Sequence, residues 1–313
     1  MNIPESFYES EVREGFYVPS FMKRSWAATL EILNEIAIIC ERHELKWWMD
    51  WGSLLATVRH GGFIPWDDDL DISMMREDYR LFLQYANEEL PKGYFANNIF
   101  NNQRFDEFHT RLVNTTELDR SDDFLNRSHG FPYLAGVDIF CIDYLSRDDK
   151  INKLYKERIF TIGSVASAIP GDSLLKDVPQ YEAGIRDIEA LCNCHFKKEK
   201  PIRQQINILC DKLMQYSPKK ESDHATCMVL YTGREYFGGV FPKEFYEEYI
   251  YMPYEFLTVP VPLHYNEILK GIFGNYMKPV RSGGVHEYPY YSQQEKLLSE
   301  QGERLPREIY EWV

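Results

Sequence analysis

The chain has 313 residues, and its 49 acidic residues against 35 Lys and Arg residues give a formal net charge of −14. Hydrophobic residues make up 44% of it and aromatic residues 15%, enough to bury a substantial core, which argues against intrinsic disorder. An acidic chain without a long polybasic tract is also a poor candidate for binding nucleic acid or an anionic membrane surface.

The expected location of the protein is the cytoplasm. No apolar run approaches the roughly 20 residues that span a bilayer, so no transmembrane segment is expected. The N-terminal stretch is acidic and interrupted by Pro4, which argues against a signal peptide. Six cysteines in a chain this long do not make a disulfide framework, so we expect reduced thiols. Peripheral attachment at the inner face of the membrane is left open.

Helices and strands alternate in the first part of the chain. A helix is predicted over 24–45, where one face collects Trp26, Leu30, Leu33, Ala37 and Cys40. A short strand over 47–50 follows, and Gly52-Ser53 separates it from a helix that starts at Leu54. We then expect a strand over 70–74, a helix over 77–90 and strands over 108–113 and 134–142. This alternation predicts an α/β (α+β) fold.

The middle of the chain has a different pattern. Residues 150–220 show helical periodicity with few strand signals, as in the apolar positions that follow Pro201. A strand over 228–232, an extended stretch over 256–263 and a helix over 266–277 are expected after it. The predicted division is an N-terminal arm over 1–23, a core over 24–148, a helical insertion or subdomain over 149–224, and a part over 225–313 that completes the core and ends in a polar tail.

The densest chemical signal is the acidic run Trp66-Asp67-Asp68-Asp69-Leu70-Asp71-Ile72. Carboxylates this close repel one another unless solvent or a cation relieves the repulsion. In a strand, Asp69 and Asp71 point to the same face, where their oxygens suit a hard divalent cation such as Mg²⁺. A solvated acidic loop is the alternative, and the apolar residues around the run argue against it. An EF-hand is excluded, because Ile72 stands where that loop needs Gly.

Two further features belong with the acidic run. Asp138 lies inside an apolar, β-like stretch, where a carboxylate is costly to bury unless it is paired or binds a metal. Gly52-Ser53 lies between a strand and a helix, where backbone amides can hold a phosphate at the helix N-terminus. A Gly-Ser turn, an Asp-x-Asp strand and a third Asp on another strand form the arrangement that nucleotidyltransferase-like folds use for metal-assisted phosphoryl transfer.

Residues 50–72, DWGSLLATVRHGGFIPWDDDLDI, closely resemble the signature of the LicD family of bacterial phosphocholine transferases, which are related to fukutin and fukutin-related protein. The resemblance continues through 109–112, 136–140 and 241–244 and ends in 259–277, with a divergent middle. It implies a nucleotidyltransferase-like mixed sheet with flanking helices and a helical insertion. The implied reaction is transfer of a phospho-alcohol from a CDP-linked donor to a sugar hydroxyl of a cell-surface glycan.

The resemblance also implies roles for single residues. The expected catalytic residues and ligands of Mg²⁺ or Mn²⁺ are Asp69, Asp71 and Asp138, and Gly52 and Ser53 would form the turn for the donor phosphate. Arg59 and Arg111 are candidate phosphate clamps, with surface salt bridges as the alternative. The remaining candidates for substrate binding are Asp68, Trp66 and His286. A zinc site at Cys192, Cys194, His195 and Cys210 is left open, although the C-x-C-H spacing favours packing.

CDP-choline is the favoured donor, because aromatic faces bind a quaternary ammonium and four tryptophans crowd the region: Trp47, Trp48, Trp51 and Trp66. Core packing is the alternative for each of them. CDP-glycerol, CDP-ribitol and CDP-ethanolamine remain open as donors, and so does a lipid-linked glycan as acceptor. The rival functions are a metal-dependent glycosyltransferase, which also uses Asp-x-Asp, and a non-catalytic binding module on a transferase scaffold.

Overall fold

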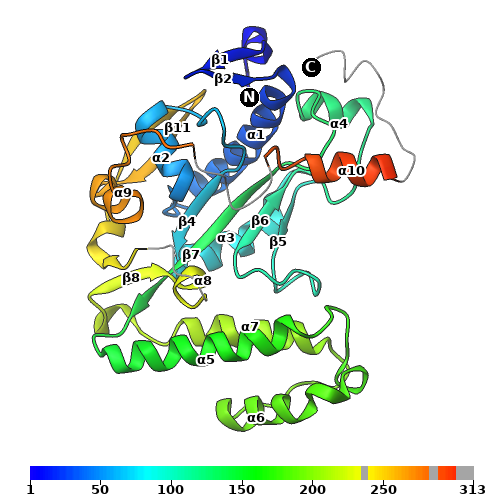
Figure 1. Ribbon diagram of the computed structural model, residues 1–313, viewed down its shortest axis with the longest axis vertical. Helices are drawn as coiled ribbons and strands as arrows, with labels where there is room; N and C mark the ends of the chain where they lie inside the picture. The colour runs from blue at the N-terminus through cyan, green and yellow to red at the C-terminus, as the bar shows by residue number, and fades with distance from the viewer. Residues whose placement is uncertain (234–238, 282–287, 301–313) are drawn as a thin grey trace. The chain divides into compact units, whose positions relative to one another are not determined.

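A mixed sheet of parallel and antiparallel strands, flanked by helices, confirms the predicted α/β fold class (Figure 1). The computed structural model describes residues 1–233, 239–281 and 288–300. The chain divides into two units. The first contains residues 1–96, 111–139 and the described residues from 249 onward, and the second contains residues 97–110 and the described residues of 140–248. The domain boundaries predicted at 23, 148 and 224 stay predictions.

The sheet places two acidic strands next to each other. Its order is β3-β4-β7-β6-β5, and β8 pairs with β7 and with β9. The bounds are β3 (Trp48–Met49), β4 (Asp71–Met75), β5 (Phe95–Asn97), β6 (Thr110–Val113), β7 (Gly136–Leu145), β8 (His224–Cys227) and β9 (Phe241–Pro242). The Asp138 N–H donates to the Leu70 carbonyl at 2.9 Å, so Asp138 on β7 lies beside the start of β4.

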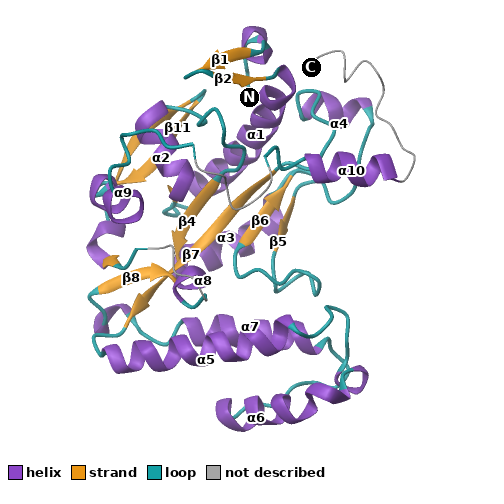
Figure 2. Cartoon of the chain, viewed as in Figure 1, coloured by secondary structure: helices purple, strands orange, loops and turns teal. Residues whose placement is uncertain are grey.

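The first unit surrounds its strands with helices and two hairpins (Figure 2). Its α-helices are α1 (Ser20–Arg42), α2 (Trp51–His60), α3 (Arg76–Glu89), α4 (Asp122–Arg127), α9 (Tyr265–Phe273) and α10 (Ser292–Glu300). The hairpins are β1 (Glu11–Arg13) with β2 (Phe16–Val18), and β10 (Tyr249–Tyr254) with β11 (Leu257–Pro262). Four members of the predicted apolar face of α1 are buried, namely Trp26, Leu30, Leu33 and Cys40, whereas Ala37 is only partly buried.

The second unit is mainly helical, as predicted for this part of the chain. Its α-helices are α5 (Asp149–Ser167), α6 (Glu182–Cys192), α7 (Ile202–Met214) and α8 (Met228–Tyr231). Figure 1 shows α5 and α7 side by side, and buried Ile159 and Ile162 share a core with Ile206 and Cys210. None of the helices within the described ranges is long and apolar enough to cross a membrane.

The structure corrects several predicted elements. The strand predicted over 228–232 is wrong: Met228–Tyr231 form α8, Thr232 follows the helix, and the strand is the preceding β8. A short apolar run is ambiguous between helix and strand by periodicity alone. Helix α2 begins at Trp51 and not at Leu54, because Asp50 caps it. The sequence also failed to indicate β5, α10 and the strands of the β1–β2 hairpin.

Candidate active site

The N-terminus of α2 is shaped by Asp50, whose side chain is buried. One Asp50 oxygen accepts from the Trp51 N–H at 2.9 Å, and the other accepts from the Ser73 hydroxyl at 2.6 Å. Burial raises the pKa of Asp50 to about 6, although both hydrogen bonds favour the charged form. Trp51 has a φ of 47°, an unfavourable conformation for a bulky residue and one that concentrates at functional sites.

A hydrogen bond to Ser53, one of the predicted site residues, joins helix α2 to β4. The Ser53 hydroxyl is buried and accepts a hydrogen bond from the Asp71 N–H at 2.8 Å. Gly52 and Ser53 lie in the first turn of α2, where a helix leaves backbone donors unused by its own ladder. A Cβ on Gly52 would lie 3.2 Å from Asp67 Oδ2, so the small residue allows the acidic run to approach the helix. The structure therefore brings Gly52, Ser53, Asp67 and Asp71 together.

The acidic run concentrates negative charge around Asp71. Burial, followed by repulsion from Asp69 and then from Asp138, raises the pKa of Asp71 well above its usual range. Burial and repulsion from Asp69 do the same for Asp67, whose carboxyl is also hydrogen-bonded to that of Asp69. Because these carboxyls lie close together, ionisation of one of them opposes ionisation of its neighbours. A bound divalent cation would relieve the repulsion among these carboxylates.

Asp138 is paired with Arg111 in this structure. Arg111 Nε and Nη2 each donate to one oxygen of the Asp138 carboxylate, both at 2.7 Å, in the bidentate geometry that guanidinium favours. Across residues 1–233, 239–281 and 288–300, no three His, Cys, Asp or Glu side chains are placed so that they could hold a metal ion. The predicted site at Asp69, Asp71 and Asp138 thus stays a prediction, although its oxygen donors suit Mg²⁺.

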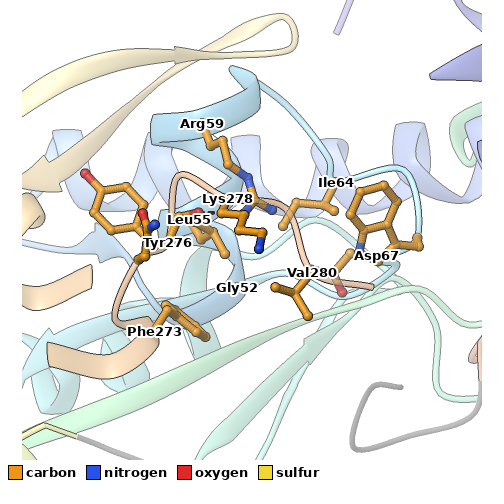
Figure 3. Close-up of a pocket in the computed structure, with 11 residues that line it drawn as sticks. Gly52, Leu55, Arg59, Ile64, Asp67, Phe273, Tyr276, Lys278 and Val280 are labelled. Atoms are coloured by element: carbon orange, nitrogen blue, oxygen red, sulfur yellow. Dashed lines mark hydrogen bonds between the residues drawn. The ribbon is translucent and has the colours of Figure 1, made fainter. Parts of the chain in front are cut away.

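A cavity of about 250 Å³ adjoins the acidic run (Figure 3). Its walls come from α2, from the loop that leads into β4, and from the end of α9 and the residues after it: Gly52, Leu55, Arg59, Ile64, Trp66, Asp67, Phe273, Asn275, Tyr276, Lys278 and Val280. In Figure 3 the charged ends of Arg59 and Lys278 lie toward the same part of the cavity, with Phe273 on one side and Asp67 on the other. Arg59 is held there, because its Nη1 donates to the Tyr276 carbonyl at 2.7 Å. Two cations beside apolar walls suit a phosphorylated ligand.

The tryptophans are divided between the core and the site. Trp47 and Trp48 are buried, which is the packing alternative considered for them. Trp66 lines the cavity, and the Arg281 guanidinium lies 5.0 Å from the centre of its ring. Because that cation already interacts with the ring, the tryptophans give weaker support to a choline site than their number in the sequence suggests.

The loop before the acidic run is fastened by Glu255. One oxygen of this carboxylate accepts from the Phe63 N–H at 3.1 Å and from Arg13 Nη1 at 2.9 Å. The Glu255 N–H donates to the Gly61 carbonyl at 2.8 Å. A Cβ on Gly62 would overlap the Glu255 carboxyl, so a larger residue at this position must displace that carboxyl.

Gly62→Ala is therefore expected to destabilise the protein by about 1–3 kcal/mol, because it displaces Glu255 from a buried N–H and from Arg13. Gly163→Ala is the matched control, since a Cβ there meets open space within α5. We expect that control to stabilise the helix by about 0.5–1 kcal/mol. Urea denaturation of both variants measures the difference, and equal stability of the two would contradict this account of Glu255.

The remaining predicted residues fall outside the cluster. Asp68 is 2% exposed, and its side chain accepts from the backbone of Tyr290. His286 lies outside the described residues. Cys210 is fully buried in the helical core with Cys192 packed against it, while the side chain of His195 is 96% exposed. The described cysteines and this histidine therefore form no group that could hold zinc.

Other residues of the site were missed by the sequence analysis. The spacing of two residues from Asp67 to Asp69 and on to Asp71 is a signal for Asp67, because alternate residues of an extended chain share a face. Asp50 had no signal beyond its place before Gly52-Ser53. Nothing in the sequence near residue 278 indicated that Lys278 lies beside Arg59.

Comparison with known proteins bears on the same stretch of chain. Residues 44–126 match the family described as LicD/FKTN/FKRP, nucleotidyltransferase domain. The chain is 38% identical over 65 residues to the lipopolysaccharide cholinephosphotransferase LicD of Haemophilus influenzae, which covers 21% of this chain and 24% of that protein. It is 35% identical over 65 residues to the ribitol 5-phosphate transferase FKRP of Mus musculus, covering 21% and 13%.

An uncharacterized protein of Rickettsia typhi is 38% identical over 64 residues, which is 20% of this chain and 21% of that protein. The matched stretches thus span about a quarter or less of the length of these curated relatives. The family match over residues 44–126 contains the α2 N-terminus and the acidic run, and it agrees with the resemblance predicted from residues 50–72. Over residues 44–126, this chain is thus similar to the nucleotidyltransferase domain of the LicD family.

Proposed function

We propose that this protein transfers a phospho-alcohol from a nucleotide-linked donor to a hydroxyl group of a glycan. The observation that carries the proposal is the acidic cluster of Asp67, Asp69 and Asp71, which lies within the LicD-matched residues 44–126. It adjoins a cavity lined by two cations, Arg59 from the matched residues and Lys278 from beyond them. Such a cavity suits a diphosphate, and such a cluster suits the cation that accompanies it. A lipid-linked acceptor and a cytoplasmic site of action stay predictions.

Arg59 and Lys278 are the groups we assign to the donor's phosphates. Arg59 is already oriented by its bond to the Tyr276 carbonyl, so it loses little freedom when it binds an anion. The N–H groups of Gly52 and Ser53 lie at the N-terminus of α2, where the helix dipole also favours a phosphate. These donors would hold the transferred phosphorus in line between the leaving nucleotide and the acceptor oxygen.

Mg²⁺ or Mn²⁺ would be held by Asp69 and Asp71, with Asp138 as the third ligand. Bound there, the cation would offset the negative charge that develops on the leaving nucleotide. Asp138 becomes a ligand in this scheme when the Arg111 guanidinium turns from it toward the donor. Arg111 then acts as the phosphate clamp predicted from the sequence.

We propose CDP-choline as the first candidate for the donor and phosphocholine as the transferred group, because the Haemophilus influenzae relative is a cholinephosphotransferase. Ribitol phosphate is the second candidate, because the mouse relative is a ribitol 5-phosphate transferase and because the cations of the cavity do not favour a quaternary ammonium beside them.

The test is a competition among CDP-choline, CDP-ethanolamine, CDP-glycerol, CDP-ribitol and a panel of nucleotide sugars at equal concentration, with Mg²⁺ and a panel of glycan acceptors, read by mass spectrometry. We expect a phospho-alcohol to be added to the acceptor. Preferential transfer of glycerol or ribitol phosphate would overturn choline alone, whereas transfer of a sugar would show the glycosyltransferase alternative instead. Absence of any transfer, with no binding of CDP, would contradict the proposal.

A further inference from the structure

We infer that Asp68 is a positioning residue that fastens residues 288–291 to the acidic loop formed by residues 65–69. The inference rests on the proposed function, because the loop positions the carboxylates Asp67 and Asp69 that the reaction would use. The three consecutive side chains have different surroundings: Asp67 lines the cavity, Asp69 is exposed and Asp68 is buried. Asp68 therefore faces the protein interior and not the cavity.

The contact of Asp68 is with a segment that lies far away in the sequence. Its Oδ2 accepts from the backbone N–H of Tyr290 at 2.6 Å. A carboxylate that accepts from a backbone N–H makes one of the stronger hydrogen bonds in a protein. The Tyr288 hydroxyl makes a second, longer contact with the same loop, 3.4 Å from the Pro65 carbonyl.

Residues 288–291 are themselves held by the first unit, so they can serve as an anchor. The hydroxyl groups of Tyr290 and Ser25 lie 3.2 Å apart. The Tyr291 ring stacks on Tyr133 with centroids 5.9 Å apart, and it meets Phe21 edge-on at 5.1 Å. Aromatic pairs with these geometries stabilise beyond the area that they bury.

On its other side, the acidic loop is held by α1. Trp26 is fully buried, and its Nε1–H donates to the Asp67 carbonyl at 3.2 Å. The loop is thus held through the backbone carbonyl of Asp67 by Trp26 and through the side chain of Asp68 by Tyr290. Without the second bond, repulsion between the Asp67 and Asp69 carboxylates is free to spread the loop, and the affinity for a cation falls because its ligands are no longer preorganised.

This role requires an acceptor oxygen at position 68, and it does not require a charge. Asp68→Asn keeps that oxygen, and Asp68→Leu has a similar shape without it. Asp119→Ala is the matched control, because Asp119 also accepts from a backbone N–H, that of Ser121 at 2.9 Å, on an exposed loop away from the cavity. Asp68→Ala is the second variant if Asp68→Leu does not fold.

We expect Asp68→Leu to raise the Mg²⁺ concentration for half-maximal transfer about tenfold, and to speed amide hydrogen exchange at residues 290–292 about tenfold or more. Asp68→Asn should stay within about threefold of the wild type in both measurements. Asp119→Ala should match the wild type.

Unchanged exchange at residues 290–292 in Asp68→Leu would overturn the inference, even if the wild type transfers a phospho-alcohol. If Asp68→Asn lost as much Mg²⁺ affinity as Asp68→Leu, the charge would matter, and Asp68 would be a ligand and not a positioning residue. A wild type without transfer on any donor would contradict the proposed function alone. The exchange measurement, together with Mn²⁺ binding by calorimetry, would then still decide the role of Asp68.

Discussion

Asp71→Asn is expected to abolish transfer, with a loss of about a thousandfold or more in kcat, while raising the melting temperature of the metal-free protein. The rate falls because a ligand of the proposed cation is lost, which removes several kcal/mol of transition-state stabilisation. The stability rises because the change removes a carboxyl whose pKa is raised by burial and by its acidic neighbours. Single-turnover rates and thermal denaturation in EDTA measure the two effects.

The matched control is Asp78→Asn on α3. Burial also raises the pKa of Asp78, but its nearest charges are Lys46 and Glu77 and not the acidic cluster. This variant should therefore keep the wild-type rate. Asp69→Asn and Asp138→Asn should lose activity as Asp71→Asn does. A near-wild-type rate in any of these three at saturating Mg²⁺ would exclude that residue as an essential ligand.

Mg²⁺ or Mn²⁺ is expected to raise the melting temperature by about 3–5 °C at neutral pH, a shift that corresponds to about 2–3 kcal/mol when the cation is about a hundredfold above its Kd. The physical reason is that the folded state holds repelling carboxylates together, and a cation binds only that arrangement. Differential scanning calorimetry with a titration of each cation measures the shift, and Na⁺ at equal ionic strength is the control.

The same experiment has a predicted dependence on pH. The pKa values of Asp50, Asp67 and Asp71 are all raised in the folded protein, to about 6 for Asp50. The folded state therefore binds these protons more tightly than the unfolded chain, whose carboxyls titrate near pH 4. Without metal, the free energy of unfolding should fall as the pH rises from about 4 through about 6, and further until Asp67 and Asp71 ionise.

Because a cation binds ionised ligands, the stabilisation by Mg²⁺ should grow across the same range of pH. Two results would contradict this account. One is a melting temperature in EDTA that increases between pH values of about 4 and 6, and the other is a cation effect as large at the acidic end as at neutral pH.

Local patterns in the sequence predicted the parts of the fold that depend on local physics. The recurrence of Trp26, Leu30 and Leu33 on one face predicted α1, because a helix buries residues at that spacing. The same reasoning found α7 from its apolar positions after Pro201. It failed at Met228–Tyr231, where four apolar residues are too few to distinguish one turn of helix from a strand.

The candidate site also contains some residues whose proximity a local sequence pattern predicts and others whose contacts no local pattern predicts. Asp69, Asp71 and Asp67 follow one another along a single extended segment, so their proximity is a local property that the sequence displays. The hydrogen bond from Arg59 to the Tyr276 carbonyl joins residues 217 positions apart, and the bond from Tyr290 to Asp68 joins residues 222 positions apart. Contacts between residues so far apart in the sequence depend on how the whole unit folds, and no local sequence pattern predicts them.

The walls of the cavity come from segments near both ends of the first unit, and this limits how the chain can be engineered. Residues 44–126 contain α2 and the acidic run, whereas Asp138, Tyr276 and Lys278 lie outside that range. A chimera that exchanged only the family-matched segment with a relative would combine one protein's α2 with another protein's facing wall. We therefore expect a chimera to acquire the donor preference of the relative only when residues 273–280 are exchanged together with residues 44–138.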